Sequence, residues 1–157
     1  MPETEEELFK DLYVAGAIDA KGEFKVEISK SKQFALNYRL LPKFVLHTDR
    51  LRLAQFLDDW FLDRAIFATV EERSKNSFQI EVSREDHLER FIDVISPHIF
   101  ATADDARLLM NDIDPLLEDA RQDKETFIQV VGLIEMMDSY NPQSKYDTEF
   151  FREEWDL

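Results

Sequence analysis

The sequence predicts an α+β protein in which a pair of strands follows each of the first two helices. Two observations support this fold class. Apolar residues recur at helical spacing in several stretches of the chain, and between the first three of these stretches they alternate with polar residues, as in strands that bury one face. The predicted order is helix, two strands, helix, two strands, helix (αββαββα), followed by further helices. Because 157 residues suit one core, we expect a single domain over 1–157, with a core at 5–100 and a helical C-terminal extension at 102–157.

The first predicted helix begins near residue 5 and ends close to a glycine. Thr4 followed by Glu7 matches a capping box, which marks a helix start. The helical pattern continues to about Ala20. Gly22 tolerates left-handed dihedral angles, so we expect the helix to stop there and the chain to turn at once into a strand.

The first strand pair is predicted from alternation on both sides of a polar turn. Residues 23–30 place Phe24 and Val26 on one face of a strand, and residues 35–47 form the second strand. The side chains expected to face the core in the second strand are Leu40, Pro42, Phe44 and Leu46. Pro42 indicates an edge strand or a bulge, because proline has no N–H for a central ladder.

The second helix and the second strand pair follow the same pattern. Thr48 is a plausible N-cap for an amphipathic helix over about 49–63. Residues 66–73 and 77–83 then alternate across a short polar turn, which predicts a hairpin.

A third helix and a helical C-terminal part complete the prediction. Ser83 is expected to open the third helix, which Pro97 ends. Thr102 is expected to cap the next helix. A later apolar stripe should run until Asn141 and Pro142, and residues 146–157 are too apolar to remain in water, which predicts a docked tail.

Composition and charge limit the possible classes of protein. The absence of cysteine excludes disulfides and thiolate metal sites, and no apolar run approaches the roughly 18 residues of a membrane span. The chain starts with acidic residues rather than a basic signal region, so we expect a soluble, cytoplasmic protein with no membrane partner.

The formal net charge of −15 argues against uniform attraction to DNA. The excess acid lies in residues 1–20 and 91–157, whereas residues 21–90 are close to neutral and could face DNA. One hypothesis for the acidic composition is a halophilic host, whose molar salt screens self-repulsion. An ordinary acidic surface that keeps the protein soluble explains it equally well.

Small residues make one face of the first helix suitable for close contact with a second helix. The residues concerned are Ala15, Gly16, Ala17 and Ala20. A self-complementary face of this kind closes naturally into a two-fold pair. We therefore expect a homodimer interface at these four residues and at Lys21, which follows them at the end of the helix.

The stretch from Val14 to Gly22 resembles the nine-residue signature of the LAGLIDADG homing endonucleases. The six agreeing letters are Ala15, Gly16, Ile18, Asp19, Ala20 and Gly22. The αββαββα order extends the resemblance over nearly the whole chain. It implies that four antiparallel strands form a saddle over the major groove of double-stranded DNA. A single motif per chain implies a homodimer that reads a pseudo-palindromic site.

The resemblance also implies a catalytic metal, and here the sequence departs from the family. The family places a metal-binding acid at the eighth position of the signature, which is Lys21 in this chain. An ammonium group cannot ligate a cation, whereas a cation in the last helical turn is favoured by the helix dipole. The Lys21 ammonium could also occupy the position of the metal, between the paired helices. Asp19 and Glu23 are the nearest acids that could hold Mg²⁺ if the protein is an active enzyme.

Two further family positions lack their usual residues. A basic residue expected after the third helix falls near Thr102, and a polar position at the end of the second strand falls at Thr48 or Asp49. The nuclease chemistry is therefore expected to be degenerate.

Basic residues of the predicted sheet are the candidates for contact with DNA. They are Lys25, Arg39, Lys43 and His47 on the strand faces, and Arg73 and Lys75 at the tip of the second hairpin. The alternative is a solvated face of mixed charge, because Glu27, Glu71 and Glu81 lie among them.

Three hypotheses for function follow from these observations. The first is a homodimeric DNA-binding protein with a degenerate nuclease site. The second is an active, metal-dependent homing endonuclease. The third is an acidic protein-interaction dimer that does not bind DNA.

Overall fold

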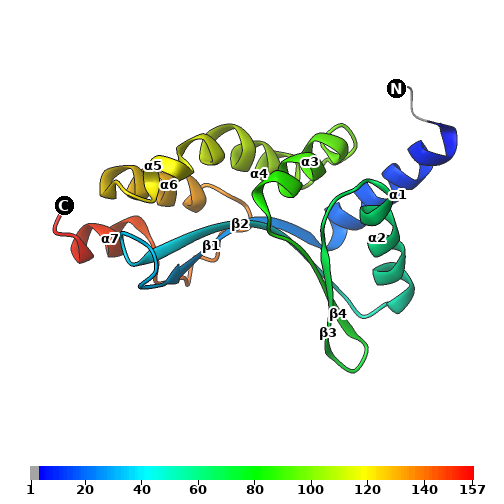
Figure 1. The fold of residues 1–157 in the computed structure, drawn as a ribbon, viewed down its shortest axis with the longest axis horizontal. Helices are drawn as coiled ribbons and strands as arrows, with labels where there is room; N and C mark the ends of the chain where they lie inside the picture. The colour runs from blue at the N-terminus through cyan, green and yellow to red at the C-terminus, as the bar shows by residue number, and fades with distance from the viewer. Residues whose placement is uncertain (1–3) are drawn as a thin grey trace. The chain divides into compact units, whose positions relative to one another are not determined.

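The computed structural model describes residues 4–157, which form an α+β fold (Figure 1). The first part of the chain contains α1 (Glu5–Lys21), β1 (Gly22–Lys30), β2 (Tyr38–Thr48), α2 (Leu51–Asp63), β3 (Thr69–Ser74), β4 (Ser77–Val82) and α3 (Glu85–Ile95). The second part contains α4 (Ala103–Arg107), η1 (Leu108–Ile113), η2 (Asp114–Leu116), α5 (Leu117–Ala120), α6 (Lys124–Glu135) and α7 (Thr148–Glu154). The predicted αββαββα order with C-terminal helices is confirmed.

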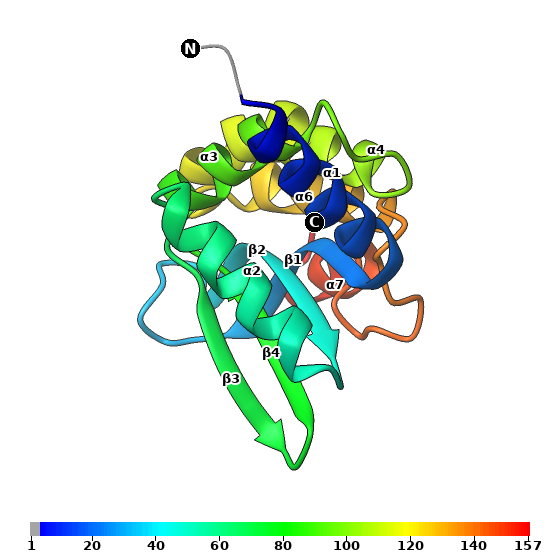
Figure 2. The same ribbon diagram turned by 90° about the vertical axis from the view of Figure 1, so that its right-hand side faces the viewer.

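The strands form one sheet in the order β1-β2-β4-β3. Strand β4 pairs antiparallel with β2 on one side and with β3 on the other. The chain divides into two compact units, one made of residues 4–24 and 43–103 and the other of residues 25–42 and 104–157. In the first unit, α2 packs on the β3–β4 hairpin (Figure 2). In the second unit, α6 lies between α5 and α7 (Figure 1).

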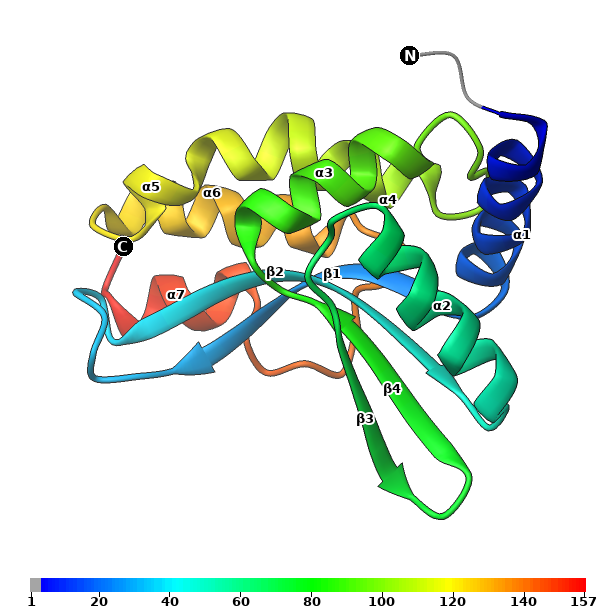
Figure 3. The ribbon, with the colours of Figure 1, turned by 45° about the vertical axis from the view of Figure 1, so that its right-hand side comes forward.

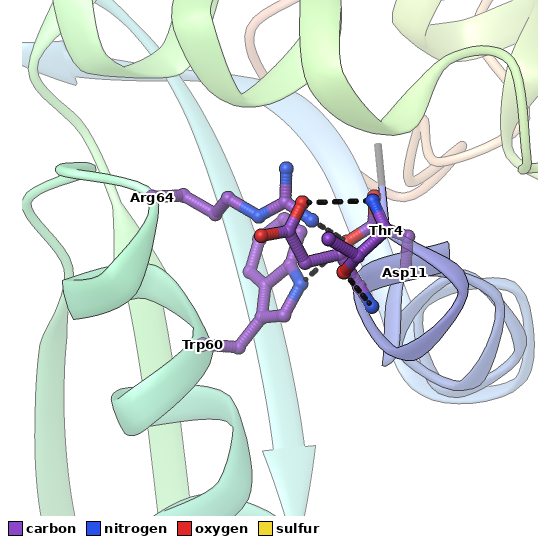
Figure 4. Close-up of polar contacts among 5 residues, drawn as sticks. Thr4, Asp11, Trp60 and Arg64 are labelled. Atoms are coloured by element: carbon purple, nitrogen blue, oxygen red, sulfur yellow. Dashed lines mark hydrogen bonds and ion pairs between the residues drawn. The ribbon is translucent and has the colours of Figure 1, made fainter. Parts of the chain in front are cut away.

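The N-terminal capping box of α1 is present as predicted. The Thr4 hydroxyl accepts a hydrogen bond from the Glu7 N–H at 3.1 Å, and the Glu7 carboxylate accepts one from the Thr4 N–H (Figure 4). One turn later, the buried Asp11 carboxylate accepts hydrogen bonds from Trp60 Nε1 at 2.9 Å and from the Arg64 guanidinium (Figure 4). These bonds join α1 to the C-terminal end of α2. They hold the two helices together firmly, because leaving the buried Asp11 carboxylate without partners would be costly.

The predicted left-handed stop at Gly22 is wrong, although α1 does end there. Gly22 has φ −95° and ψ 160°, which is extended backbone. The glycine is required for space instead, because a Cβ at this position would lie 2.6 Å from Cε1 of Phe44. That ring is buried and packs against Phe24 and Phe91 with ring centroids 5.0 and 4.9 Å away.

This packing predicts the effect of adding one methyl group at the helix–strand junction. Gly22→Ala should lower the free energy of unfolding by about 1–3 kcal/mol, because the buried Phe44 ring cannot move away without disturbing its neighbours. Gly132→Ala is the matched control. A Cβ there would lie 3.7 Å from the Thr148 methyl group, an ordinary contact. Urea unfolding compares the two variants, and equal midpoints would contradict the overlap.

Strand β2 begins at Tyr38 rather than at residue 35, because the preceding residues form turns that end at Asn37 with φ 67°. Its inner face is as predicted: Leu40, Pro42, Phe44 and Leu46 are buried. The prediction of an edge strand is wrong, since β2 is internal in the sheet. Pro42 is accommodated because the pairing of β2 with β4 starts only at Phe44.

The two predicted helix caps at Thr48 and Ser83 are wrong. Thr48 is the buried last residue of β2, and its hydroxyl accepts the Arg50 N–H at 3.1 Å. The N-caps of α2 and α3 are Arg50 and Arg84, neither of which makes a side-chain cap. Thr48 belongs to β2, and Ser83 lies in the connection between β4 and α3. Neither residue therefore directly precedes the helix that it was predicted to cap.

The C-terminal tail docks as predicted, although the helix before it is shorter. Helix α6 ends at Glu135, before Asn141 and Pro142. Within the second unit, Phe151 of α7 is fully buried and its ring lies 4.9 Å from those of Tyr38 and Phe127. The Tyr38 hydroxyl donates to the Glu154 carboxylate. Burial and this bond raise the pKa of Tyr38 to about 12.

Candidate functional site

An apolar stripe on α1 faces away from the body of its unit. Phe9 and Tyr13 are 64% and 58% exposed, and Gly16 and Ala20 continue the stripe at helical spacing. A Cβ at Gly16 would meet no atom within 4 Å. The stripe therefore leaves room for another backbone to approach α1 closely.

The predicted small-residue face is narrower than the sequence indicated. Ala15 is 1% exposed and lies with Val14 and Ile18 on the inner side of α1. Ala17 is half-buried, and Gly16 and Ala20 are exposed. The available face therefore combines small residues near the C-terminal end of α1 with aromatic residues near its N-terminal end.

The aromatic end of the stripe forms a groove with α2. Phe9 and Tyr13 line an apolar groove of about 480 Å³ together with Phe56. The Tyr13 and Phe56 rings meet edge to face with centroids 5.0 Å apart. Figure 3 shows α1 and α2 side by side in this unit. The signal for these aromatics in the sequence was their helical spacing with Gly16 and Ala20.

The other end of α1 carries the residues considered for metal chemistry. Lys21 is exposed in the last turn of the helix. The Asp19 carboxylate accepts three hydrogen bonds from the loop after α3: from the Phe100 N–H at 2.7 Å, the Thr102 N–H at 3.0 Å and the Thr102 hydroxyl at 2.7 Å. Asp19 therefore fixes a loop that lies far from it in sequence.

These hydrogen bonds control the ionisation of Asp19. Partial burial alone would raise the pKa of Asp19, but the bonds from the Thr102 side chain and from the Phe100 and Thr102 backbone hold the pKa below its ordinary value. The carboxylate therefore stays ionised. The negatively charged carboxylate thus accepts the hydrogen bonds that hold the loop after α3 in place.

The residues at this helix end do not fit a divalent cation. Both oxygens of Asp19 are engaged by the loop, and the Lys21 ammonium, two residues away, would repel a cation. Glu23 is exposed in β1. Within residues 4–157, no three histidine or acidic side chains gather where they could hold a metal ion.

The Asp19 bonds predict a pH-dependent effect on stability. At pH 7, Asp19→Ala should lower the free energy of unfolding by about 1–3 kcal/mol, because hydrogen bonds to a charged group are lost. The pKa of Asp19 is lower in the folded state. Its contribution is therefore complete above the unfolded pKa of about 3.9 and disappears as the pH falls through the folded value.

Urea unfolding of wild type and Asp19→Ala between pH 7 and pH 2.5 measures this effect. The two curves should approach one another only at the acidic end of the range. Thr102→Val, which removes the hydroxyl donor but keeps the carboxylate, serves as the milder control. A difference between wild type and Asp19→Ala that does not change with pH would contradict the assignment.

The predicted DNA-contacting residues of the first unit lie on one face of β2, β3 and β4. His47 is exposed opposite Gln79 in the pairing of β2 with β4. Lys43 has a side chain only 11% exposed, and its Nζ lies 3.3 Å from the Glu81 carboxylate. Arg73 is exposed, 3.4 Å from Glu71. This face therefore carries paired charges rather than an excess of positive charge.

The remaining predicted contacts differ in exposure. Lys75 is exposed in the turn between β3 and β4, where Asn76 takes the left-handed conformation. In the second unit, Lys25 is half-buried and Arg39 is exposed, with its guanidinium 6.0 Å from the Phe34 ring. Of the six residues, Arg39, His47, Arg73 and Lys75 are thus exposed, whereas Lys25 and Lys43 are half-buried.

Comparison with known proteins gives a fold assignment without a sequence match. No family model and no curated protein matches the chain. Solved structures do match, and they assign to this chain the fold of the LAGLIDADG homing endonucleases. The resemblance noted at residues 14–22 therefore extends to the whole architecture.

Three solved structures illustrate the similarity. The homing endonuclease I-CvuI in complex with a DNA target in the presence of Mg has 17% identity and a TM-score of 0.81, covering 96% of this chain and 94% of that chain. The archaeal intron-encoded homing endonuclease I-Vdi141I complexed with DNA has 19% identity and a TM-score of 0.76, with coverages of 96% and 99%. The LAGLIDADG meganuclease I-CpaMI bound to uncleaved DNA has 15% identity and a TM-score of 0.73, with coverages of 93% and 48%.

Over 4–157, no helix combines the length and the apolar character needed to cross a bilayer.

Proposed function

We propose that two copies of this chain pair through α1 and bind double-stranded DNA without cutting it. The observation that carries the proposal is the C-terminal end of α1, where an exposed lysine stands at the metal-binding position of the motif and the neighbouring Asp19 carboxylate is bonded to a loop. Metal-assisted phosphodiester hydrolysis would need a bound cation, whereas phosphate contacts by lysine and arginine side chains would not.

Pairing through α1 is supported by its exposed stripe and by a comparison of lengths. Apolar side chains such as Phe9 and Tyr13 gain stability when a partner covers them. I-CpaMI is matched over 48% of its length, so one copy of this fold corresponds to half of that DNA-bound protein. A second copy of the present chain would supply the other half. A two-fold pair would read a pseudo-palindromic duplex.

In this pair, Lys21 takes a direct role in binding. One exposed ammonium from each subunit would lie at the end of the paired helices, where it can neutralise phosphate charge that a metal would otherwise meet. Arg39, His47 and Lys75 provide further contacts from the strands and the hairpin turn. The Lys43 to Glu81 pair positions the strands rather than contributing free charge.

Selection from random duplex DNA at several salt concentrations, with magnesium and with chelator, tests the proposal. Enrichment of uncut duplexes in both conditions is the expected result. Cleavage in magnesium would instead identify an active endonuclease. Neither enrichment nor cleavage would reject DNA binding and favour the protein-interaction dimer.

The exposed cations predict how binding responds to charge reversal. Arg39→Glu combined with Lys75→Glu should abolish a gel shift, because each change replaces an attraction to phosphate by a repulsion. Stability should change by no more than about 0.5 kcal/mol, as is usual for surface positions. Arg107→Glu, at a side chain 67% exposed on α4, is the control and should keep the shift.

Salt dependence gives a second measurement of the same surface. Because much of the positive charge of the sheet face is already paired with Glu71 and Glu81, few phosphates can be neutralised. The slope of log affinity against log salt should correspond to about three to five contacts at roughly 0.9 per contact. A slope that corresponds to about ten contacts would mean that the DNA binds to a surface other than this sheet face.

A further inference from the structure

Phe100 stands out because its side chain is 90% exposed on a backbone that is held firmly in place. Its N–H donates to Asp19, and its carbonyl accepts the Ala103 N–H at 3.3 Å. The preceding Ile99 is buried, and the N–H of Thr102 is bonded to Asp19. The loop therefore presents a phenylalanine to solvent with little backbone freedom left to lose on binding.

The position of this loop relates it to the candidate binding end of α1. Asp19 holds the Phe100 backbone within hydrogen-bond distance of the last turn of α1, and exposed Lys21 belongs to the same turn. A cation and an ordered aromatic ring are thus attached to one helix end, on opposite sides of the helix, because residues two apart differ by about 200° in direction. This combination suits duplex DNA, where phosphates take the charge and the base stack takes the ring.

The loop lies beside the pairing face of α1 and not on it. At about 100° per residue, Ala20 lies about 40° to one side of Gly16 and Asp19 lies about 60° to the other. The stripe of Phe9, Tyr13, Gly16 and Ala20 therefore runs along one side of α1, and Asp19 with the loop that it binds lies to the other side of Gly16. This arrangement favours DNA over a second copy as the partner of Phe100.

We infer that Phe100 is an apolar wedge that enters between two base pairs of the duplex bound at this end of α1. This inference rests on the proposed DNA binding. Apolar side chains inserted between base steps partly unstack them and kink the duplex. Sequences with easily unstacked pyrimidine–purine steps at that position should therefore be preferred, although a phenyl ring makes no hydrogen bond to a base edge.

The test uses the duplex enriched in the selection described above, with 2-aminopurine placed at one step at a time. Wild type should change the fluorescence at one step in each half of the site, and Phe100→Ala should abolish that change while binding about tenfold or more weakly, the loss expected for one aromatic–base contact. Phe100→Leu, which keeps an apolar side chain, should retain part of the signal. Leu62→Ala, at another exposed apolar residue with 77% exposure, is the matched control and should behave as wild type.

The possible failures are distinguishable. If wild type binds but no step responds, or if Phe100→Ala leaves the response unchanged, the wedge is wrong and DNA binding stands. If Phe100→Ala lowers the solution mass, Phe100 is a subunit contact and the wedge is again wrong. If wild type binds no duplex in the selection, the proposed function fails and the wedge fails with it.

Discussion

Gly16→Leu is expected to separate the paired chains while leaving each chain folded. The single chain and the pair differ in what surrounds Gly16. A Cβ at Gly16 meets no atom within 4 Å in the single chain, so a leucine there points into solvent and improves helix propensity by up to about 1 kcal/mol. In a pair, the same leucine would fill the space into which the second helix must pack.

The expected loss of association is large because symmetry places the change in the interface twice. Overpacking costs about 1–3 kcal/mol per site, so two sites should weaken the dimer by roughly 30-fold or more. Sedimentation equilibrium should give the mass of one chain, 18.6 kDa, for the variant and twice that mass for wild type. DNA binding should fall with it, since each half of a palindromic site needs one subunit.

Two control variants make this result specific. Gln129→Leu adds the same side chain at an exposed position of α6 and should remain dimeric. Gly16→Ala adds only a methyl group and should weaken the pair less than leucine does. A wild type with the mass of one chain at micromolar concentration would contradict pairing through α1.

The sequence predicted the elements whose signals are local and repeated. Phe24 and Val26 in β1, and Leu40, Phe44 and Leu46 in β2, alternate strictly, and all five are buried. The Thr4 and Glu7 cap needs residues only three positions apart, and it is present. Local patterns of this kind carry their own evidence, because one element contains every residue involved.

The errors occurred where a residue serves a neighbouring element instead. Thr48 and Ser83 match the chemistry of helix caps, yet both helices start later, and Thr48 completes β2. Gly22 matches a left-handed stop, yet it is needed for the close approach of Phe44 from another strand. Local pattern cannot distinguish these uses, because the competing partner lies elsewhere in the chain.

The candidate site was partly predictable for the same reason. The signature at 14–22 located the helix through which we propose that the chains pair, but the inward direction of Ala15 depends on how α1 packs. The bonds from Asp19 to Phe100 and Thr102 join residues more than 80 positions apart. No spacing rule links them, so Asp19 looked like a possible metal ligand and the exposed Phe100 gave no signal.

Lys21→Asp is expected to make the stability of the paired protein depend on divalent cations. The substitution would bring one carboxylate from each subunit to the end of the paired α1 helices, which provides hard oxygen ligands and also places like charges together. Without metal, the pair should weaken through this repulsion, and each helix should lose about 0.3–1 kcal/mol of favourable interaction between Lys21 and the helix dipole. Calcium or magnesium should reverse the loss.

The size of the metal effect follows from linkage. At a free metal concentration 100 times the dissociation constant, stability should rise by about 2.7 kcal/mol, which thermal unfolding with and without chelator measures directly. Wild type should show no such rise, and its DNA binding should be the same in magnesium and in chelator. Lys21→Asn has nearly the shape of the aspartate without its charge, so it should weaken the pair less and should not respond to metal.

Cleavage is a weaker expectation for Lys21→Asp than metal binding. Asp19 remains bonded to the loop after α3, and a bound metal alone does not place the attacking water. Thr48 is buried in this protein and Thr102 is bonded to Asp19, so neither is available to activate that water. Metal-dependent cleavage by the unmutated protein, abolished by Asp19→Asn or Glu23→Gln, would overturn this interpretation and establish an active endonuclease.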